Sequence, residues 1–169
     1  LAGSDILIDD TSGITVTGMK AKLRRVDNLG LVVIDYLQLM QSDRHIDNRV
    51  QEVAEISRAM KIMAKELMVP VICCAQLSRG PESRTVKKPM LSDLRDSGAI
   101  EQDADVVIFL YRDDYYKNAE GNDVPADTEQ NVAEIIVAKN RHGSTDTIKI
   151  GWTGRYTKFR ELAQEDTPR

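Results

Sequence analysis

The chain alternates between short apolar runs and longer polar or amphipathic stretches. Four apolar runs have the length of a strand, at residues 31–35, 71–76, 106–111 and 134–138. A continuous apolar run is typical of a strand that is buried on both faces, as in a parallel sheet covered by helices. This pattern predicts an α/β fold with a buried sheet.

A long amphipathic segment, residues 47–68, is the clearest predicted helix. Its apolar side chains recur at spacings of three and four residues, which gives one apolar stripe: Val50, Val53, Ala54, Met60, Met63, Ala64 and Leu67. The order strand, helix, strand over residues 31–76 is a βαβ unit, whose crossover is right-handed and whose strands are parallel.

The remaining segments predict smaller elements. A capping residue, Thr15 or Thr17, begins a short helix that ends near Gly30. The other expected elements are a short buried strand at 5–10, a long loop at 77–92, a flexible excursion at 112–131, and an antiparallel edge formed by 147–152 and 157–162.

Polar residues stand at the carboxyl ends of three of the apolar runs. Asp35 and Gln76 end two of them, and Lys139 and Arg141 follow the last. Ligands of open α/β sheets bind outside the carboxyl ends of the strands. An apolar strand that ends in Asp is also the Walker B element of ATPases, whose carboxylate helps to hold magnesium. If their strands are neighbours, Asp35 and Gln76 address one ligand, and the two cations are a plausible phosphate-facing pair.

One segment resembles the sequence motif of a phosphate-binding loop. Residues 13–20, Gly-Ile-Thr-Val-Thr-Gly-Met-Lys, resemble GxxxxGK[ST], but Met19 occupies the lysine position and Lys20 the Ser/Thr position. Each position of that motif has its own geometric task, so the shift of one residue excludes a phosphate-binding loop here.

The charge is uneven along the chain. The 169 residues carry a formal net charge of −4, which excludes a generally basic surface for nucleic acid. Cations are nevertheless concentrated over residues 79–95, and Arg95 precedes a Ser97–Gly98 turn whose backbone amides suit phosphate oxygens. The alternative is a solvated loop followed by a helix with an arginine on its surface.

Several classes of protein have no support in the sequence. No apolar run is long enough to span a bilayer, and the adjacent Cys73 and Cys74 are expected to be reduced, buried thiols of a cytoplasmic protein. His45 and His142 belong to no metal-ligand spacing and to no catalytic triad, so hydrolysis through a protein nucleophile is not indicated.

Five segments together resemble the bacterial replicative DNA helicases of the DnaB type. They are VVIDYLQLM at 32–40, AQLSR at 75–79, SDLRDSGAIEQDAD at 92–105, FLYRDDYY at 109–116 and AKNRHG at 138–143. The resemblance covers nearly the whole chain. It implies a RecA-like three-layer α/β fold, with a mostly parallel sheet and an antiparallel edge, truncated at its amino-terminal side.

The resemblance also implies roles for individual residues. Asp35 is similar to the Walker B carboxylate that positions Mg²⁺, and Gln76 to the sensor of the ATP γ-phosphate. Lys139 and Arg141 match a basic pair that reaches the ATP of the neighbouring subunit in a homo-hexamer, with Arg141 as the arginine finger. The residues that match the contact with single-stranded DNA are Arg95, Asp96 and Gly98.

The family pattern is incomplete in this sequence. In the family, the Walker A phosphate loop and a catalytic glutamate precede the region that matches Leu1, as does the amino-terminal domain that binds primase. We therefore expect a partial helicase ATPase domain at 1–162 with a tail at 163–169, which binds ATP weakly and does not hydrolyse it alone.

The expected parent protein is a cytoplasmic helicase that translocates on single-stranded DNA, unwinds duplex DNA at the replication fork and meets a helicase loader and other replisome proteins. Two alternatives remain at this point. One is another RecA-like ATPase, such as a recombinase or a phage primase-helicase, and the other is a non-catalytic module that binds single-stranded DNA or a partner protein.

Overall fold

The computed structural model describes residues 5–78, 84, 86–113 and 132–162, without the side chains of residues 95–97. The chain forms two compact units. Unit 1 comprises residues 1–77 and 96–103, and unit 2 comprises residues 78–95 and 104–169. The chain therefore leaves unit 1 after Leu77 and returns to it at Asp96 for a single short segment.

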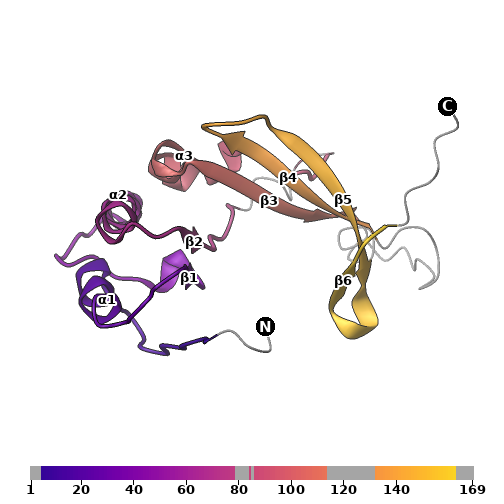
Figure 1. The fold of residues 1–169 in the computed structure, drawn as a ribbon. Coiled ribbons are helices and arrows are strands. Elements are labelled where there is room, and N and C mark those ends of the chain that lie inside the picture. The colour runs from indigo at the N-terminus through magenta and orange to yellow at the C-terminus, as the bar shows by residue number, and fades with distance from the viewer. Residues whose placement is uncertain (1–4, 79–83, 85, 114–131, 163–169) are drawn as a thin grey trace, which may run out of the picture. The chain divides into compact units, whose positions relative to one another are not determined.

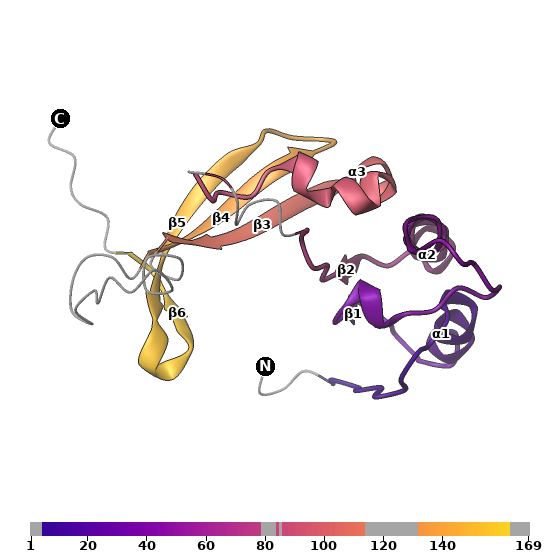
Figure 2. The same ribbon diagram turned by 180° about the vertical axis from the view of Figure 1, so that it is seen from behind.

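Unit 1 is built on a pair of short parallel strands, β1 (Val32–Ile34) and β2 (Val71–Cys73). Helix α2 (Arg49–Leu67) connects them, which confirms the predicted βαβ unit. Helix α1 (Val16–Leu23) precedes β1, and α3 (Gly98–Asp103) returns from later in the chain. Both views show α1 and α2 beside the two strands (Figures 1 and 2).

The ends of the helices follow from their capping residues. The Thr15 side chain accepts a hydrogen bond from the Gly18 N–H, at 3.2 Å, and so begins α1. This cap places the Gly13–Lys20 segment at a helix start, in agreement with its exclusion as a phosphate-binding loop. Asn48 begins α2 by accepting from the N–H groups of Val50 and Gln51, and Met68 ends it in the left-handed conformation.

The core of unit 1 lies between α2 and one face of the strand pair. Its most deeply buried side chains are Leu37, Ile56 and Met63, each about 1% exposed. Burying a side chain of this size contributes about 1.5–3 kcal/mol. The predicted stripe of α2 is largely correct, but Val50 is exposed, and Ile56 and Ser57 are buried instead. Ser57 is accommodated because its hydroxyl donates to Asp103 of α3, at 3.1 Å.

Two expectations for unit 1 are wrong. The predicted strand at residues 5–10 is not formed, and Leu7 and Ile8 in it are exposed. A strand needs a partner for its backbone, and no described strand lies beside residues 5–10.

The β1–β2 pair was expected to be buried on both faces but is covered on one face only. Val32 and Ile34 are buried, whereas Val33 is 61% and Ile72 54% exposed.

Unit 2 is an antiparallel sheet with the strand order β3-β4-β5-β6. The strands are β3 (Val106–Arg112), β4 (Val132–Asn140), β5 (Asp146–Thr153) and β6 (Lys158–Arg160). A 3₁₀ segment, η3 (Leu91–Ser97), precedes α3 and spans the boundary between the units. In Figure 1, β3, β4 and β5 lie side by side, and β6 follows at the end of β5.

The α/β class and the antiparallel β5–β6 edge agree with the sequence. The balance of strand pairings does not, because among the described strands only β1 and β2 pair in parallel. A parallel crossover normally contains a helix. The polar stretch at 112–131 has no helical apolar stripe, and the β4–β5 connection is a short turn, so both favour antiparallel neighbours. Residues 114–131, predicted to be a flexible excursion, lie outside the described residues.

Candidate functional site

Asp35 and Gln76 lie at the carboxyl ends of two paired strands. Ile34 is aligned with Cys73, so Asp35 comes one residue after the end of the ladder and Gln76 three residues after it. Both residues are exposed. Among the described residues, neither side chain has a hydrogen-bond partner, so the carboxylate and the amide are available to a ligand.

The backbone beyond the two strands stays tightly connected. The chain leaves Asp35 through a cis Asp35–Tyr36 peptide bond and enters η1 (Leu37–Leu39). The N–H of Cys74 donates to the Ile34 carbonyl and the N–H of Leu37 to the Cys74 carbonyl, each at 2.9 Å. Hydrogen bonding between the two segments therefore continues past the strands.

Gln38 completes this connection with its side chain. Its Nε2 donates to the Gln76 carbonyl at 3.1 Å, and its Oε1 accepts from the Gln76 N–H at 3.2 Å. A primary amide that both donates to and accepts from one residue fixes the position of that backbone. Gln38 itself is held by Arg49, whose Nη2 donates to the Gln38 carbonyl at 2.7 Å. Gln38 is a polar side chain between Leu37 and Leu39, shortly after a predicted strand, and this interruption of an apolar stretch was the signal that sequence reasoning did not use.

The two cysteines of β2 and its extension differ in their surroundings. Burial raises the pKa of the Cys73 thiol to about 12, and the neighbouring Cys74 adds to this shift. Cys73 is therefore a thiol at neutral pH, as expected for a reduced core cysteine. Cys74 is exposed, which corrects the expectation that both are buried.

Lys139 and Arg141 belong to unit 2. Lys139 lies in β4, and its Nζ donates to the Ala104 carbonyl at 2.8 Å. Arg141 follows the strand, its N–H donates to the Asp105 carbonyl at 2.8 Å, and its Nε lies 3.6 Å from Asp105 Oδ1. The two cations are thus both attached to the short segment that leads from α3 into β3.

This arrangement corrects one expectation. Lys139 and Arg141 do not follow a parallel strand, because β4 is antiparallel to both of its neighbours. The structure brings the four predicted nucleotide-site residues together as two pairs, Asp35 with Gln76 in unit 1 and Lys139 with Arg141 in unit 2. Asp105, which holds Arg141, was not predicted, although an acid before an apolar strand is a visible signal.

The predicted DNA contacts lie in η3 and at the start of α3. The side chains of Arg95 and Asp96 lie outside the described part of the chain. Gly98 is exposed, and a Cβ added to it would have no atom within 4 Å. The fold of the described residues therefore does not require glycine at position 98.

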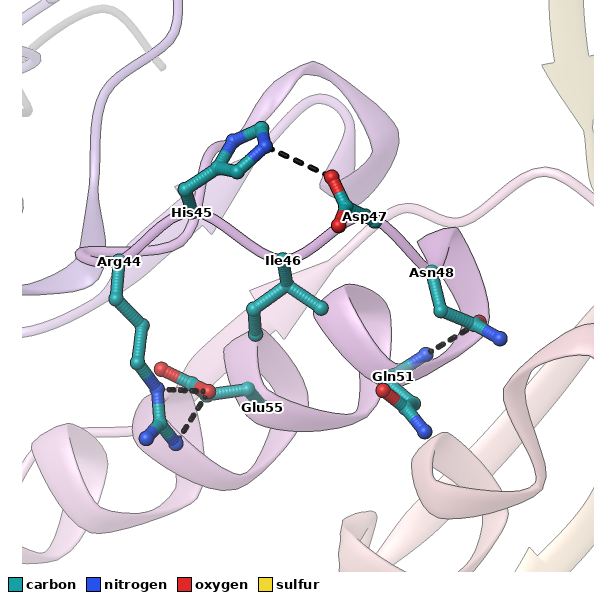
Figure 3. A pocket seen from close by; sticks show the side chains of 7 residues that line it. All are labelled: Arg44, His45, Ile46, Asp47, Asn48, Gln51 and Glu55. Carbon is teal, nitrogen blue, oxygen red and sulfur yellow. Dashed lines mark hydrogen bonds and ion pairs between the residues drawn. The ribbon is translucent and has the colours of Figure 1, made fainter.

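A separate open pocket of about 500 Å³ lies at the amino-terminal end of α2 (Figure 3). Its charged side chains are paired with one another: Arg44 contacts Glu55 at 2.7 Å, and His45 contacts Asp47 at 2.8 Å. None of the residues predicted from the sequence lines it. Within the described ranges, no group of three or more His, Cys, Asp or Glu side chains is arranged to hold a metal ion. Nor does that part of the chain contain a helix long and apolar enough to cross a membrane.

Comparison with solved structures finds the same arrangement of elements in known proteins. A solved ATPase domain superposes with a TM-score of 0.84 at 42% identity, over 95% of this chain and 56% of that one. A DnaB-like replicative helicase, solved in a study of its interactions with primase, gives a TM-score of 0.81 at 42% identity, over 91% of this chain and 37% of that one. At 42% identity, this chain resembles both proteins in sequence as well as in fold.

Curated relatives agree with the structural matches. The replicative DNA helicase DnaC of Bacillus subtilis is 52% identical over 96% of this chain and 35% of its own length. The replicative DNA helicase DnaB of Geobacillus stearothermophilus is 51% identical over the same shares. The chain therefore spans about a third of the length of the curated relatives that it matches.

The family model of the DnaB-like helicase C-terminal domain matches residues 1–161. This match covers every described element and all the predicted site residues. The curated relatives named above are both replicative DNA helicases. The chain belongs to the family of DnaB-like helicase C-terminal domains.

Proposed function

We propose that this chain supplies part of the ATPase motor of a hexameric replicative DNA helicase, which moves along single-stranded DNA and unwinds the duplex at the fork. The observation that carries the proposal is the pair of exposed polar side chains, Asp35 and Gln76, at the ends of two parallel strands that Gln38 joins. In open α/β sheets, ligands bind outside the carboxyl ends of the strands, and nucleotides are among them.

Asp35 fits a magnesium ion that arrives with ATP. Mg²⁺ keeps several waters and usually takes one or two protein carboxylates together with phosphate oxygens. An exposed carboxylate that has no partner among the described residues suits that role. The ion would neutralise charge on the phosphates, Asp35 would hold it, and Gln76 would contact the γ-phosphate.

Lys139 and Arg141 act on the nucleotide of a neighbouring subunit in this proposal. Arg141 is attached to Asp105 at its backbone, while its side chain remains 43% exposed. A guanidinium that a neighbouring carboxylate orients and that is still 43% exposed is suited to contact a phosphate across a subunit boundary. An arginine finger of this kind is worth about 10³- to 10⁵-fold in turnover.

Gly98 supports the proposed contact with single-stranded DNA. A position where the fold leaves room for a side chain, yet glycine stands, suits close approach of a backbone to a ligand. In the proposal, the amide of Gly98 and the side chains of Arg95 and Asp96 contact the DNA backbone. The other partners would be the identical subunits of the ring, primase and a helicase loader.

A complementation experiment tests the shared nucleotide site. The gene product that contains this chain is prepared as Asp35→Asn and as Arg141→Ala, and each variant alone should hydrolyse ATP poorly in the presence of Mg²⁺ and single-stranded DNA. In mixed rings, some boundaries combine an intact Asp35 with an intact Arg141, so mixing should restore activity. A tagged pull-down establishes that the two variants co-assemble.

Co-assembled rings without restored hydrolysis would contradict the shared site. Normal turnover by Arg141→Ala alone would remove the finger role from that residue. Failure of the unaltered protein to unwind a forked duplex with ATP would reject the helicase function as a whole.

The DNA contact is tested with Arg95→Ala and Gly98→Ala. Both should weaken binding of a fluorescent oligonucleotide and leave ATP affinity unchanged. Arg95→Ala should also reduce the slope of log Kd against log salt by about one. Because the fold has room for a methyl group at position 98, unchanged DNA affinity of Gly98→Ala would exclude close approach of DNA there.

A further inference from the structure

Asp93 is a buried carboxylate that no role above explains. It is 5% exposed and lies in unit 2. Its Oδ2 accepts from the Met90 N–H at 2.8 Å and forms an ion pair with Nη2 of Arg84. A buried charge is strongly unfavourable unless it is paired and hydrogen-bonded, so these contacts hold Asp93 in one place.

The backbone of Asp93 is hydrogen-bonded as well as its side chain. Its N–H donates to the Met90 carbonyl at 2.8 Å, and its carbonyl accepts from the Ser78 N–H at 3.2 Å. Residues far apart in the loop, Ser78 and Asp93, are thereby fastened to each other. We call this group, Ser78, Arg84, Met90 and Asp93, the loop latch.

The loop latch lies where the chain passes between the two units. Ser78 is two residues after Gln76 and is the first residue of unit 2. Asp93 is two residues before Arg95, the last residue of unit 2 before the chain returns to unit 1. The path from Gln76 to Arg95 thus consists of two residues to Ser78, one hydrogen bond to Asp93 and two residues to Arg95.

We propose that Asp93 is a positioning residue that couples Gln76 to the DNA-contacting turn at Arg95. This inference rests on the proposed function, since it assigns the sensor to Gln76 and the DNA contact to Arg95. The Asp93 carboxylate, fixed by Arg84 and Met90, keeps the backbone at Ser78 and the backbone leading to Arg95 in a fixed position within unit 2. Weakening the loop latch lowers the stimulation of ATP hydrolysis by DNA and leaves basal hydrolysis in place.

The test compares basal and DNA-stimulated ATP hydrolysis in the gene product that contains this chain. Asp93→Asn keeps an acceptor for Met90 but removes the charge opposite Arg84. We expect basal hydrolysis to be retained and the stimulation by single-stranded DNA to fall by between about 2-fold and 30-fold, the range of coupling between linked sites. Hydrogen exchange should show faster exchange of the Ser78 amide.

Two Arg84 variants test the same ion pair even if Asp93→Asn fails to fold. Arg84 contacts Asp93 through a single nitrogen, and its Nε has no hydrogen-bond partner among the described residues. A lysine ammonium is able to replace one such contact, so Arg84→Lys should retain most of the stimulation. Arg84→Gln should lose it as Asp93→Asn does.

Lys88 provides the matched control. It belongs to the same loop, but its Nζ forms an ion pair with a different carboxylate, that of Glu134 in β4, at 2.6 Å. Lys88→Ala should leave the stimulation unchanged. A general loosening of the loop would instead reduce the stimulation in both Lys88→Ala and Asp93→Asn, which would overturn the assignment to Asp93.

The remaining outcomes distinguish failure of this inference from failure of the proposed function. Normal stimulation of Asp93→Asn, or of Arg84→Gln if Asp93→Asn fails to fold, would overturn the inference and leave the proposed function standing. Equal loss in Arg84→Lys and Arg84→Gln would exclude the charge pair as the cause. Unaltered protein that single-stranded DNA does not stimulate would overturn both the inference and the proposed function.

Discussion

The side chain of Gln38 offers a direct test of how the strand ends are held. Gln38→Ala removes both hydrogen bonds to the Gln76 backbone, which measure 3.1 and 3.2 Å. A typical hydrogen bond contributes about 0.5–1.5 kcal/mol net. Because Gln38 is partly exposed, water replaces part of the loss, and about 1–2 kcal/mol is the expected cost of freeing this backbone.

Hydrogen exchange of the Gln76 amide measures this cost locally. The Gln76 N–H donates directly to Gln38 Oε1, so its protection depends on the bond that the substitution removes. A loss of about 1–2 kcal/mol corresponds to about 5- to 30-fold faster exchange in Gln38→Ala. Local exchange is preferable to a melting curve, because a chain of two units need not unfold in one transition.

Two further variants make the result specific. Gln38→Glu keeps an acceptor for the Gln76 N–H but places a carboxylate against the Gln76 carbonyl, which repels it. The Gln76 amide should therefore exchange at least as fast in Gln38→Glu as in Gln38→Ala. Gln51→Ala, an exposed glutamine on α2, is the control and should leave the Gln76 amide unaffected. Unchanged exchange of that amide in Gln38→Ala would refute the role of Gln38.

Three other predictions follow from the packing and electrostatics of unit 1. Ile56→Ala should lower its free energy of unfolding by about 2–5 kcal/mol in a denaturant titration, because the side chain is 1% exposed; a loss below about 1 kcal/mol would contradict the core assignment. The hydrogen bond from Arg49 lowers the pKa of Glu52, so its stabilisation is present above the unperturbed pKa of 4.5 and is lost as pH falls through the folded value. Arg49→Gln should flatten this acid dependence of stability, and an unchanged slope would exclude the pair as its cause. At pH 8, iodoacetamide should modify the exposed Cys74 quickly and Cys73 slowly, since burial raises the pKa of Cys73 to about 12; equal labelling of Cys73→Ser and Cys74→Ser would be inconsistent with that difference.

Local features of the fold were predictable from the sequence. The period of apolar residues located α2, and Asn48 and Thr15 begin their helices through side-chain hydrogen bonds that depend on nearby residues alone. Asp35 and Gln76 were identified as strand-end residues because a βαβ unit permits one handedness and one relative direction of its strands. These properties follow from contacts close in sequence or from a strong topological rule.

Properties that depend on distant partners were decided by the tertiary structure. An apolar run has the same appearance whether one or both of its faces are covered, so the exposure of Val33 and Ile72 was not visible in the sequence. The antiparallel direction of β4 depends on which strands it meets, and the division of the predicted site between two units depends on contacts between residues distant in sequence.

The family, the α2 helix and the two strand ends that carry Asp35 and Gln76 could all be predicted from the residues alone. Three supports became visible in the folded chain: the Gln38 amide on the Gln76 backbone, Asp105 beside Arg141, and the buried Asp93 that holds Ser78. The physical reason is that each of these supports joins groups distant in sequence. A hydrogen bond between them depends on position in space, which residue spacing does not record.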